Sequence, residues 1–201
     1  MGNLSISKIY IDKEIKILEV AEGFRSTPYL DTKGLWTWGI GRNYQGYPLT
    51  LSERSYIRDV TEEPLNVDKP WSLFYSTDVL SNIPDHLARQ IADYFVKQVL
   101  MEIDARFYSQ TGWFAEVEDA RKSAWLDLAY NVGLYGVMSW RESLKLMEDE
   151  QYEELAEHLL GFPWAHQVHA DKPSPNNPTG GRAFYITEMI RTGEYPSWIK
   201  E

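Results

Sequence analysis

Glu22, Asp31 and Thr37 lie close together near the amino terminus, and their side-chain types suit acid–base chemistry. The apolar spacing predicts a helix from about Asp12 to Ala21, so Glu22 falls at its C-terminal end. Unsatisfied carbonyl groups give that end a partial negative charge, which favours the protonated form of a carboxyl group. Asp31 opens a polar turn and is expected to stay ionised. The two carboxyl groups would therefore differ in protonation.

Two carboxyl groups in unequal environments are what cleavage of a glycosidic bond requires. One protonates the departing oxygen, and the other helps water to attack the sugar carbon or supports the developing positive charge. An alternative interpretation assigns no chemistry: Glu22 ends a helix, Asp31 starts a turn and Thr37 is an ordinary strand residue. These residue types are common, so their spacing alone leaves both interpretations open.

A small hairpin should position these side chains. The turn Asp31-Thr32-Lys33-Gly34 is flanked by β-favouring residues, which predicts two strands between Ser26 and Ile40. On the second strand Leu35, Thr37 and Gly39 share one face, and Trp36, Trp38 and Ile40 share the other. We expect the two tryptophans to pack the small lobe rather than to stack on sugar rings.

The rest of the chain is expected to be mainly helical. Prolines interrupt residues 43–85, which predicts short helices and loops there. Downstream, apolar periodicity predicts a long helix, a buried core helix and three shorter helices, with a loop before the last one. Their approximate ranges are 85–107, 118–132, 138–148, 152–160 and 183–192, and the loop covers 165–181.

Three segments near the amino terminus are similar to a known family: Glu22-Gly23-Phe24-Arg25, residues 29–34 and residues 36–41. They resemble the phage-type lysozymes (endolysins), the T-even-phage-type muramidases of glycoside hydrolase family 24. The resemblance resumes in residues 129–133 and 190–193 and covers roughly two-thirds of the chain. It implies that Glu22, Asp31 and Thr37 are catalytic. It also implies substrate contacts at Leu35, Gly39, Tyr130 and Asn131, and a place for Arg182 behind the catalytic Glu.

The fold that the resemblance implies is α+β, mainly α, with two lobes in a single lysozyme-like domain over residues 1–201. A small lobe of about 12–84 would contain the β-hairpin and an inserted segment, 43–85. A connecting helix of about 85–107 would lead to a helical lobe of about 108–201, on which the first helix packs. The glycan would lie in the cleft between the lobes.

The function that the resemblance implies is cleavage of the β-1,4 bond between N-acetylmuramic acid and N-acetylglucosamine in peptidoglycan, leading to cell-wall lysis. Glu22 would be the acid, while Asp31 and Thr37 would position and activate the water. We expect inversion, with the two carboxyl groups more than about 6 Å apart. The alternatives are a glycan-binding or structural module with little activity, and a virion-associated lysin or secreted antibacterial effector.

Some features depart from the family pattern. Arg42 stands where the family usually has His, so the ion pair at this position must differ. The net charge of −10, from 20 basic and 30 acidic residues, disfavours adsorption to an anionic cell wall and binding to nucleic acid. Residues 43–85 and 165–181 resemble insertions, and either could bind a protein partner.

Composition also restricts location and cofactors. The chain has no cysteine, which excludes disulfides and thiol nucleophiles. Its first residues lack the apolar core of a signal peptide, and no apolar run is long enough to span a membrane. We therefore expect synthesis in a bacterial cytoplasm without a signal peptide. The resemblance implies action at the cell wall, with holin-dependent release as one route. We expect no cofactor and no metal, although His166, His169 and Asp171 have ligand-like spacing.

Overall fold

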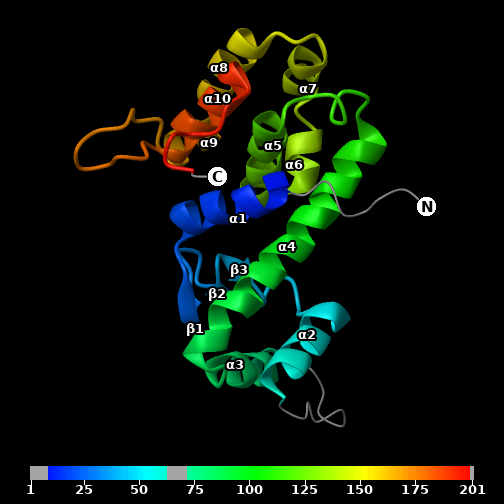
Figure 1. The fold of residues 1–201 in the computed structure, drawn as a ribbon, viewed down its shortest axis with the longest axis vertical. Coiled ribbons are helices and arrows are strands. Elements are labelled where there is room, and N and C mark those ends of the chain that lie inside the picture. The colour runs from blue at the N-terminus through cyan, green and yellow to red at the C-terminus, as the bar shows by residue number, and fades with distance from the viewer. Residues whose placement is uncertain (1–8, 63–71, 200–201) are drawn as a thin grey trace. The chain divides into compact units, whose positions relative to one another are not determined.

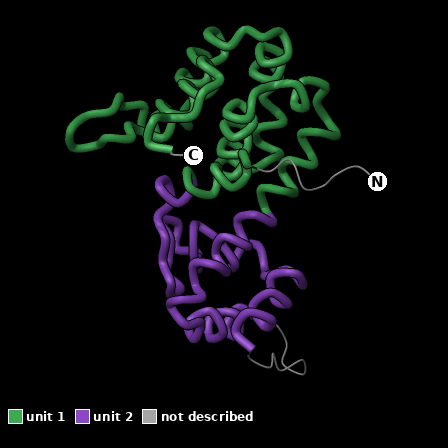
Figure 2. Tube along the Cα trace, in the orientation of Figure 1, with its two compact units in different colours: residues 1–17, 99–201 green, residues 18–98 purple. Residues whose placement is uncertain are grey.

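The computed structural model describes residues 9–62 and 72–199. It is mainly helical, with one small antiparallel sheet near the amino terminus (Figure 1), which confirms the predicted α+β, mainly α class. The chain divides into two compact units (Figure 2). The small unit comprises residues 18–98, and the large unit comprises residues 1–17 and 99–201.

The sheet of the small unit follows the first helix, α1 (Ile9–Glu22), and has the order β1-β2-β3. The strands are β1 (Arg25–Leu30), β2 (Trp36–Gly39) and β3 (Arg42–Asn43), so the predicted hairpin is confirmed and a short third strand is added. Gly39 and Gly41 have φ angles of 64° and 68°, which favour glycine. They reverse the chain after β2, which lets β3 pair with it.

The inserted segment forms two short helices, as predicted, in its described part. These are α2 (Leu51–Thr61) and α3 (Leu73–Ser81), and residues 63–71 between them lie outside the described residues. Thr50 and Glu53 form a reciprocal capping box at the start of α2. Ser72 caps α3 by accepting a hydrogen bond from the backbone of Tyr75 at 3.2 Å. Each helix thus begins at a local capping signal.

The core of the small unit lies between the sheet and the first half of α4 (Asp85–Gln110), the long helix that the periodicity predicts. The Trp38 ring is fully buried, with its centroid 5.7 Å from that of Phe95 on α4. Its indole N–H donates to the carbonyl of Ser26 at 2.9 Å. The packing role predicted for Trp38 is therefore confirmed.

The large unit is built around α5 (Asp119–Val132), in which every residue from Ala120 to Ala129 is buried. This confirms the prediction of a core helix. The last helix, α10 (Arg182–Thr192), packs against α5, α8 (Tyr152–Leu160) and α9 (Pro163–Gln167) (Figure 1). The helices after α5 are α6 (Leu134–Met138), α7 (Arg141–Glu148), α8 (Tyr152–Leu160), α9 (Pro163–Gln167) and α10 (Arg182–Thr192).

Two predicted boundaries in the large unit are wrong. The single helix expected over 138–148 is interrupted, because Trp140 has a ψ angle of 65° and α7 begins only after it. The loop expected from Ala165 starts later, because residues 165–167 belong to α9. Pro163 opens that short helix, and its fixed φ suits the first turn.

Within the described ranges, no helix is both long enough and apolar enough to cross a bilayer.

Candidate active site

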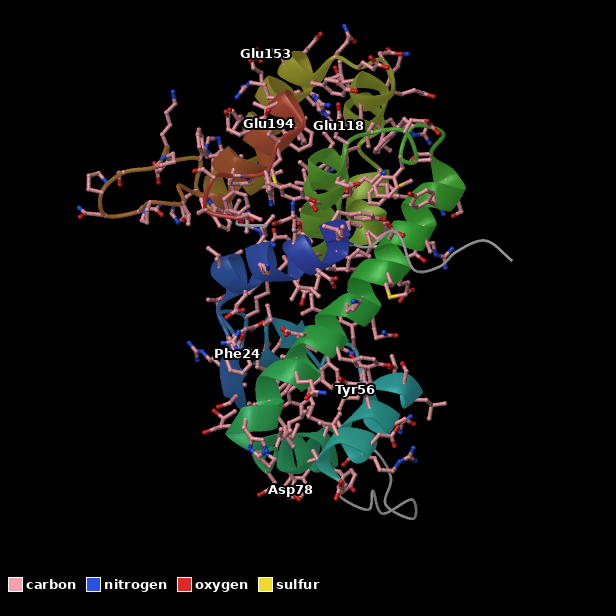
Figure 3. The ribbon with its side chains drawn as sticks, in the orientation of Figure 1. Phe24, Tyr56, Asp78, Glu118, Glu153 and Glu194 are labelled. Carbon is pink, nitrogen blue, oxygen red and sulfur yellow. The ribbon has the colours of Figure 1, made fainter. Side chains whose placement is uncertain are left out.

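Glu22 is the last residue of α1, and its side chain is half-buried. Gly23 ends the helix with a φ angle of 72°, and its N–H donates to the carbonyl of Glu19 at 2.9 Å. The chain then passes through Phe24 into β1 (Figure 3). The carboxyl group is therefore held at the corner between the helix and the sheet, at the negative end of the helix dipole.

The backbone of the turn after β2 packs closely against the side chain of Glu22. A Cβ atom added to Gly41 would lie 3.1 Å from Cγ of Glu22 and 3.2 Å from its Oε2. The backbone of Gly39 lies close to α4, because a Cβ atom added to Gly39 would lie 2.8 Å from Cβ of Ala92. The two glycines thus allow the backbone to approach the side chain of Glu22 on one side and α4 on the other.

Asp31 follows β1 and is oriented by its own turn. Its Oδ1 accepts hydrogen bonds from the backbone N–H groups of Lys33 at 2.8 Å and Leu35 at 2.9 Å. The turn is closed by the N–H of Gly34, which donates to the carbonyl of Asp31 at 3.0 Å. Oδ2 has no hydrogen bond to any residue of the described chain, so this oxygen is available to a ligand or water.

Thr37 lies on β2, directly opposite Tyr29 on β1. Its side chain is buried, and its hydroxyl donates to the carbonyl of Leu35 at 3.1 Å. Because the hydroxyl hydrogen is used in this bond, the Thr37 oxygen is left as an acceptor. Leu35 itself is half-buried and lies in the turn rather than on the strand.

Tyr29 connects the three predicted catalytic residues. Burial raises the pKa of its phenol above the ordinary value, and the charges of Glu22 and Asp31 add to this rise, while Arg25 opposes it. The Arg25 guanidinium lies 4.3 Å from the centre of the Tyr29 ring. Tyr29 is thus within electrostatic reach of both carboxyl groups and faces Thr37 across the ladder. The small unit therefore brings the three residues together around this ring.

Neither Tyr29 nor Gly41 was predicted to have a role in the site. The signal for Tyr29 was present, because strand alternation places it on the same side as Asp31, two residues on. No comparable signal existed for Gly41, whose contact with Glu22 depends on how the turn after β2 packs against the end of α1.

Arg42, the departure from the family pattern, makes an ion pair with Glu53 of α2. The guanidinium Nε and Nη2 lie 2.8 Å and 3.0 Å from the two carboxylate oxygens, and both side chains are buried. Nη1 also donates to the carbonyls of Asn43 and Tyr47, each at 2.8 Å. This bidentate pair joins β3, next to the Gly41 turn, to the first inserted helix.

Tyr130 and Asn131 lie in the last turn of α5, in the large unit, whereas Glu22, Asp31 and Thr37 belong to the small unit. The Asn131 side-chain oxygen accepts a hydrogen bond from the indole N–H of Trp164 at 3.0 Å. Trp164 therefore orients the Asn131 amide. Substrate contact by these two residues, and by Leu35 and Gly39, stays a prediction.

Arg182 is the first residue of α10 and is buried. A cation is unfavourable at the positive end of a helix, so the sequence predicts that another group holds it. The structure confirms this: the Arg182 Nε donates to Oδ1 of Asp127 on α5 at 2.7 Å. The place of Arg182 behind Glu22 stays a prediction.

Comparison with known proteins agrees with this arrangement. Residues 19–172, more than half of the chain, match the family model described as phage lysozyme. The chain belongs to the phage lysozyme family. The matched range includes Glu22, Asp31 and Thr37 and ends before Arg182.

A relative shows similarity over nearly the whole length. The protein named "Probable T4-type lysozyme 1" from Dictyostelium discoideum is 22% identical over 186 residues, which cover 88% of this chain and 92% of the relative. Membership of the phage lysozyme family makes this chain a lysozyme-like glycoside hydrolase of the peptidoglycan-hydrolysing kind.

Proposed function

We propose that the chain hydrolyses the β-1,4 bond between N-acetylmuramic acid and N-acetylglucosamine, with Glu22 as the general acid and Asp31 and Thr37 as the residues that hold the water. The observation that carries this proposal is the arrangement around Tyr29. One carboxyl group is held at a helix end and another by backbone amides, with a threonine oxygen on the facing strand.

The hydrogen bonds of Asp31 and Thr37 give the water its orientation. Asp31 Oδ1 is occupied by backbone donors, so Oδ2 accepts one hydrogen of the water. The Thr37 hydroxyl donates to Leu35, so its oxygen accepts the other hydrogen. The water then presents a lone pair to the sugar carbon while Glu22 protonates the departing oxygen. One proton leaves Glu22, and the attacking water releases one to Asp31.

A water between the two carboxyl groups implies inversion. Inverting glycosidases separate their carboxyl groups by about 6.5–9.5 Å to leave room for this water, whereas retaining ones place them about 5–5.5 Å apart. A β-linked substrate should therefore release the α-anomer first. NMR spectroscopy of the product during the first turnovers checks this, and an initial β-anomer would contradict inversion.

The decisive experiment measures reducing-end and muropeptide release from purified sacculi by the wild-type chain and Glu22→Gln. We expect the substitution to reduce release by several orders of magnitude, because an amide is too weak an acid to protonate the departing oxygen. The matched control is Glu19→Gln, one turn earlier on α1, which breaks a partly exposed ion pair with Arg89. Circular dichroism establishes that each variant is folded.

Two results would oppose the proposal. Equal losses in Glu19→Gln and Glu22→Gln would show that the end of α1, rather than the Glu22 carboxyl group, is needed. A wild-type chain that binds sacculi and releases no reducing ends would favour the alternative of a glycan-binding module. The lytic role, with release by a holin or delivery as an effector, is a further proposal that rests on this activity.

A further inference from the structure

The large unit contains a buried group of ionisable side chains that the proposed reaction does not use directly. Glu14 of α1 and Asp127 of α5 are both 0% exposed, and Arg182 of α10 is 8% exposed. The Arg182–Asp127 ion pair, at 2.7 Å, is one side of this group. We call Glu14, Asp127 and Arg182 the buried triad.

The triad contains two carboxyl groups and one guanidinium. If both carboxyl groups were ionised, the buried triad would carry an uncompensated negative charge. Desolvation makes such a charge very unfavourable, and a buried group then becomes neutral instead. Arg182 is bonded to Asp127, so Glu14 is the group that should carry the extra proton.

The polar groups around Glu14 are either neutral or are cations that interact with other residues. Ser123 of α5 is neutral, and its hydroxyl lies 3.2 Å from the carbonyl of Tyr10 and 2.9 Å from the hydroxyl of Tyr195. Lys13 of α1 lies over the Tyr195 ring, 4.5 Å from its centre. Lys122 of α5 pairs with the carboxylate of Asp119 at 3.7 Å. Both carboxyl oxygens of Glu14 are buried, and neither has a hydrogen-bond partner in the described part of the chain.

A further acidic residue near α1, Asp104, cannot compensate the charge of an ionised Glu14. Tyr10, one turn before Glu14, donates its hydroxyl to the carboxylate of Asp104 on α4. Asp104 is itself buried and negative, so it cannot offset the charge of an ionised Glu14.

We propose that the Glu14 carboxyl group holds a proton at neutral pH, which makes the buried triad electrically neutral. The direction of titration agrees: burial raises the pKa of Glu14 well above its ordinary value, the Asp127 charge adds to the rise, and Arg182 opposes it. The site is a buried proton-binding site, and loss of its proton limits the stability of the large unit at alkaline pH.

The sign of the pH dependence follows from linkage. An unfolded Glu ionises near pH 4.3, whereas folded Glu14 keeps its proton to a higher pH. The contribution of this group to stability is therefore fully present below about pH 4.3 and is lost as the pH rises toward the pKa of the folded protein. Across that window the folded state binds one more proton than the unfolded state, so the unfolding equilibrium constant rises about tenfold per pH unit from this group alone.

The test is denaturant unfolding of the wild-type chain and Glu14→Gln between about pH 5 and 9. Gln has the shape of a protonated Glu and carries no charge, so the variant should fold. Below the pKa of folded Glu14 the ratio of the two unfolding constants should change by about tenfold per pH unit, with the wild-type chain losing stability as the pH rises, and above that pKa the ratio should level off. The matched control is Glu154→Gln, an exposed residue of α8, for which the ratio should not depend on pH.

The proposal would be overturned if the ratio of the two unfolding constants did not change with pH, or if the wild-type chain gained stability relative to Glu14→Gln as the pH rises. Either result would mean that folded Glu14 is ionised. If Glu14→Gln does not fold, infrared spectroscopy of the wild-type chain with ¹³C-labelled glutamate decides the question. The proposal requires a protonated carboxylic-acid band at pH 7, and the absence of this band would refute it.

Discussion

Glu22 is positioned by a glycine that lies nineteen residues further along the chain. The backbone of Gly41 approaches the Glu22 side chain so closely that any larger residue must displace one or the other. The candidate acid therefore depends on two separate local features. One is the end of α1, and the other is the turn between β2 and β3.

We predict that Gly41→Ala lowers kcat on sacculi by tenfold or more and changes KM little, because the new methyl group lies 3.1 Å from Glu22 Cγ. The φ angle of 68° adds backbone strain of about 1–2 kcal/mol. Gly34→Ala is the control: its φ angle is 75° and its Cβ would meet nothing within 4 Å. Steady-state kinetics with chemical denaturation separates the two effects. Equal losses of kcat in both variants would mean that strain alone accounts for the effect.

The Thr37 oxygen gives a second prediction at this scale. Thr37→Val keeps the shape of the side chain and removes the acceptor for the attacking water. We expect kcat to fall by about a hundredfold, at the lower end of the range for a positioned acid–base group. Thr37→Ser keeps the hydroxyl group and should retain most of the activity. Rates with both variants on the same sacculi provide the comparison. Similar rates for the two variants would show that the oxygen has no part in the reaction.

At the scale of elements, the Arg42–Glu53 ion pair connects the sheet to the inserted segment. Both side chains are buried, and Glu53 also accepts the backbone N–H of Thr50 in the α2 capping box. The Glu53 carboxylate thus takes part both in the ion pair and in the capping of α2. The Arg42–Glu53 pair thus holds the region after β3 against α2.

We predict that Arg42→Met destabilises the chain by about 3–5 kcal/mol, because it leaves the Glu53 carboxylate buried and unpaired. Adding Glu53→Leu should recover much of this loss, except for about 1 kcal/mol from the capping box. Arg58→Met, which breaks an exposed pair with Asp59, should cost less than about 1 kcal/mol. Urea unfolding gives the three values. A double variant that is no more stable than Arg42→Met would contradict the charge argument.

At the scale of the whole molecule, the net charge of −10 should govern encounter with the cell wall. Exposed glutamates on and beside α7 and α8, including Glu153 (Figure 3), contribute to this charge. Repulsion between this surface and an anionic wall decreases as salt screens it, with a Debye length of about 30 Å at 0.01 M and about 8 Å at 0.15 M.

We therefore predict that kcat/KM on sacculi increases when ionic strength is raised from about 0.01 M to about 0.15 M. Replacing the exposed residues Glu148, Glu150, Glu154 and Glu157 by Gln changes the net charge from −10 to −6 and should weaken this salt dependence. Initial rates at several salt concentrations measure both effects. A rate that decreases with salt would mean that attraction, rather than repulsion, governs the encounter.

The sequence by itself determined the elements whose signals are local. The Asp31 turn, the periodicity of α4 and the unbroken burial of α5 all follow from residues within a few positions of one another. The family motif added the candidate set Glu22, Asp31 and Thr37, which the fold holds around Tyr29. The two wrong boundaries, near Trp140 and after Pro163, lie where short helices meet and apolar periodicity continues across the break.

Only the tertiary structure decided which partners meet across long distances in the chain. Three such contacts depend on packing between separate elements: the approach of the Gly41 backbone to Glu22, the Arg42–Glu53 ion pair and the Asp127–Arg182 ion pair. Burial also decides the chemistry, since desolvation determines whether a carboxyl group such as that of Glu14 can remain charged. These properties arise from the environment that the folded chain creates, and no local pattern of residue types encodes them.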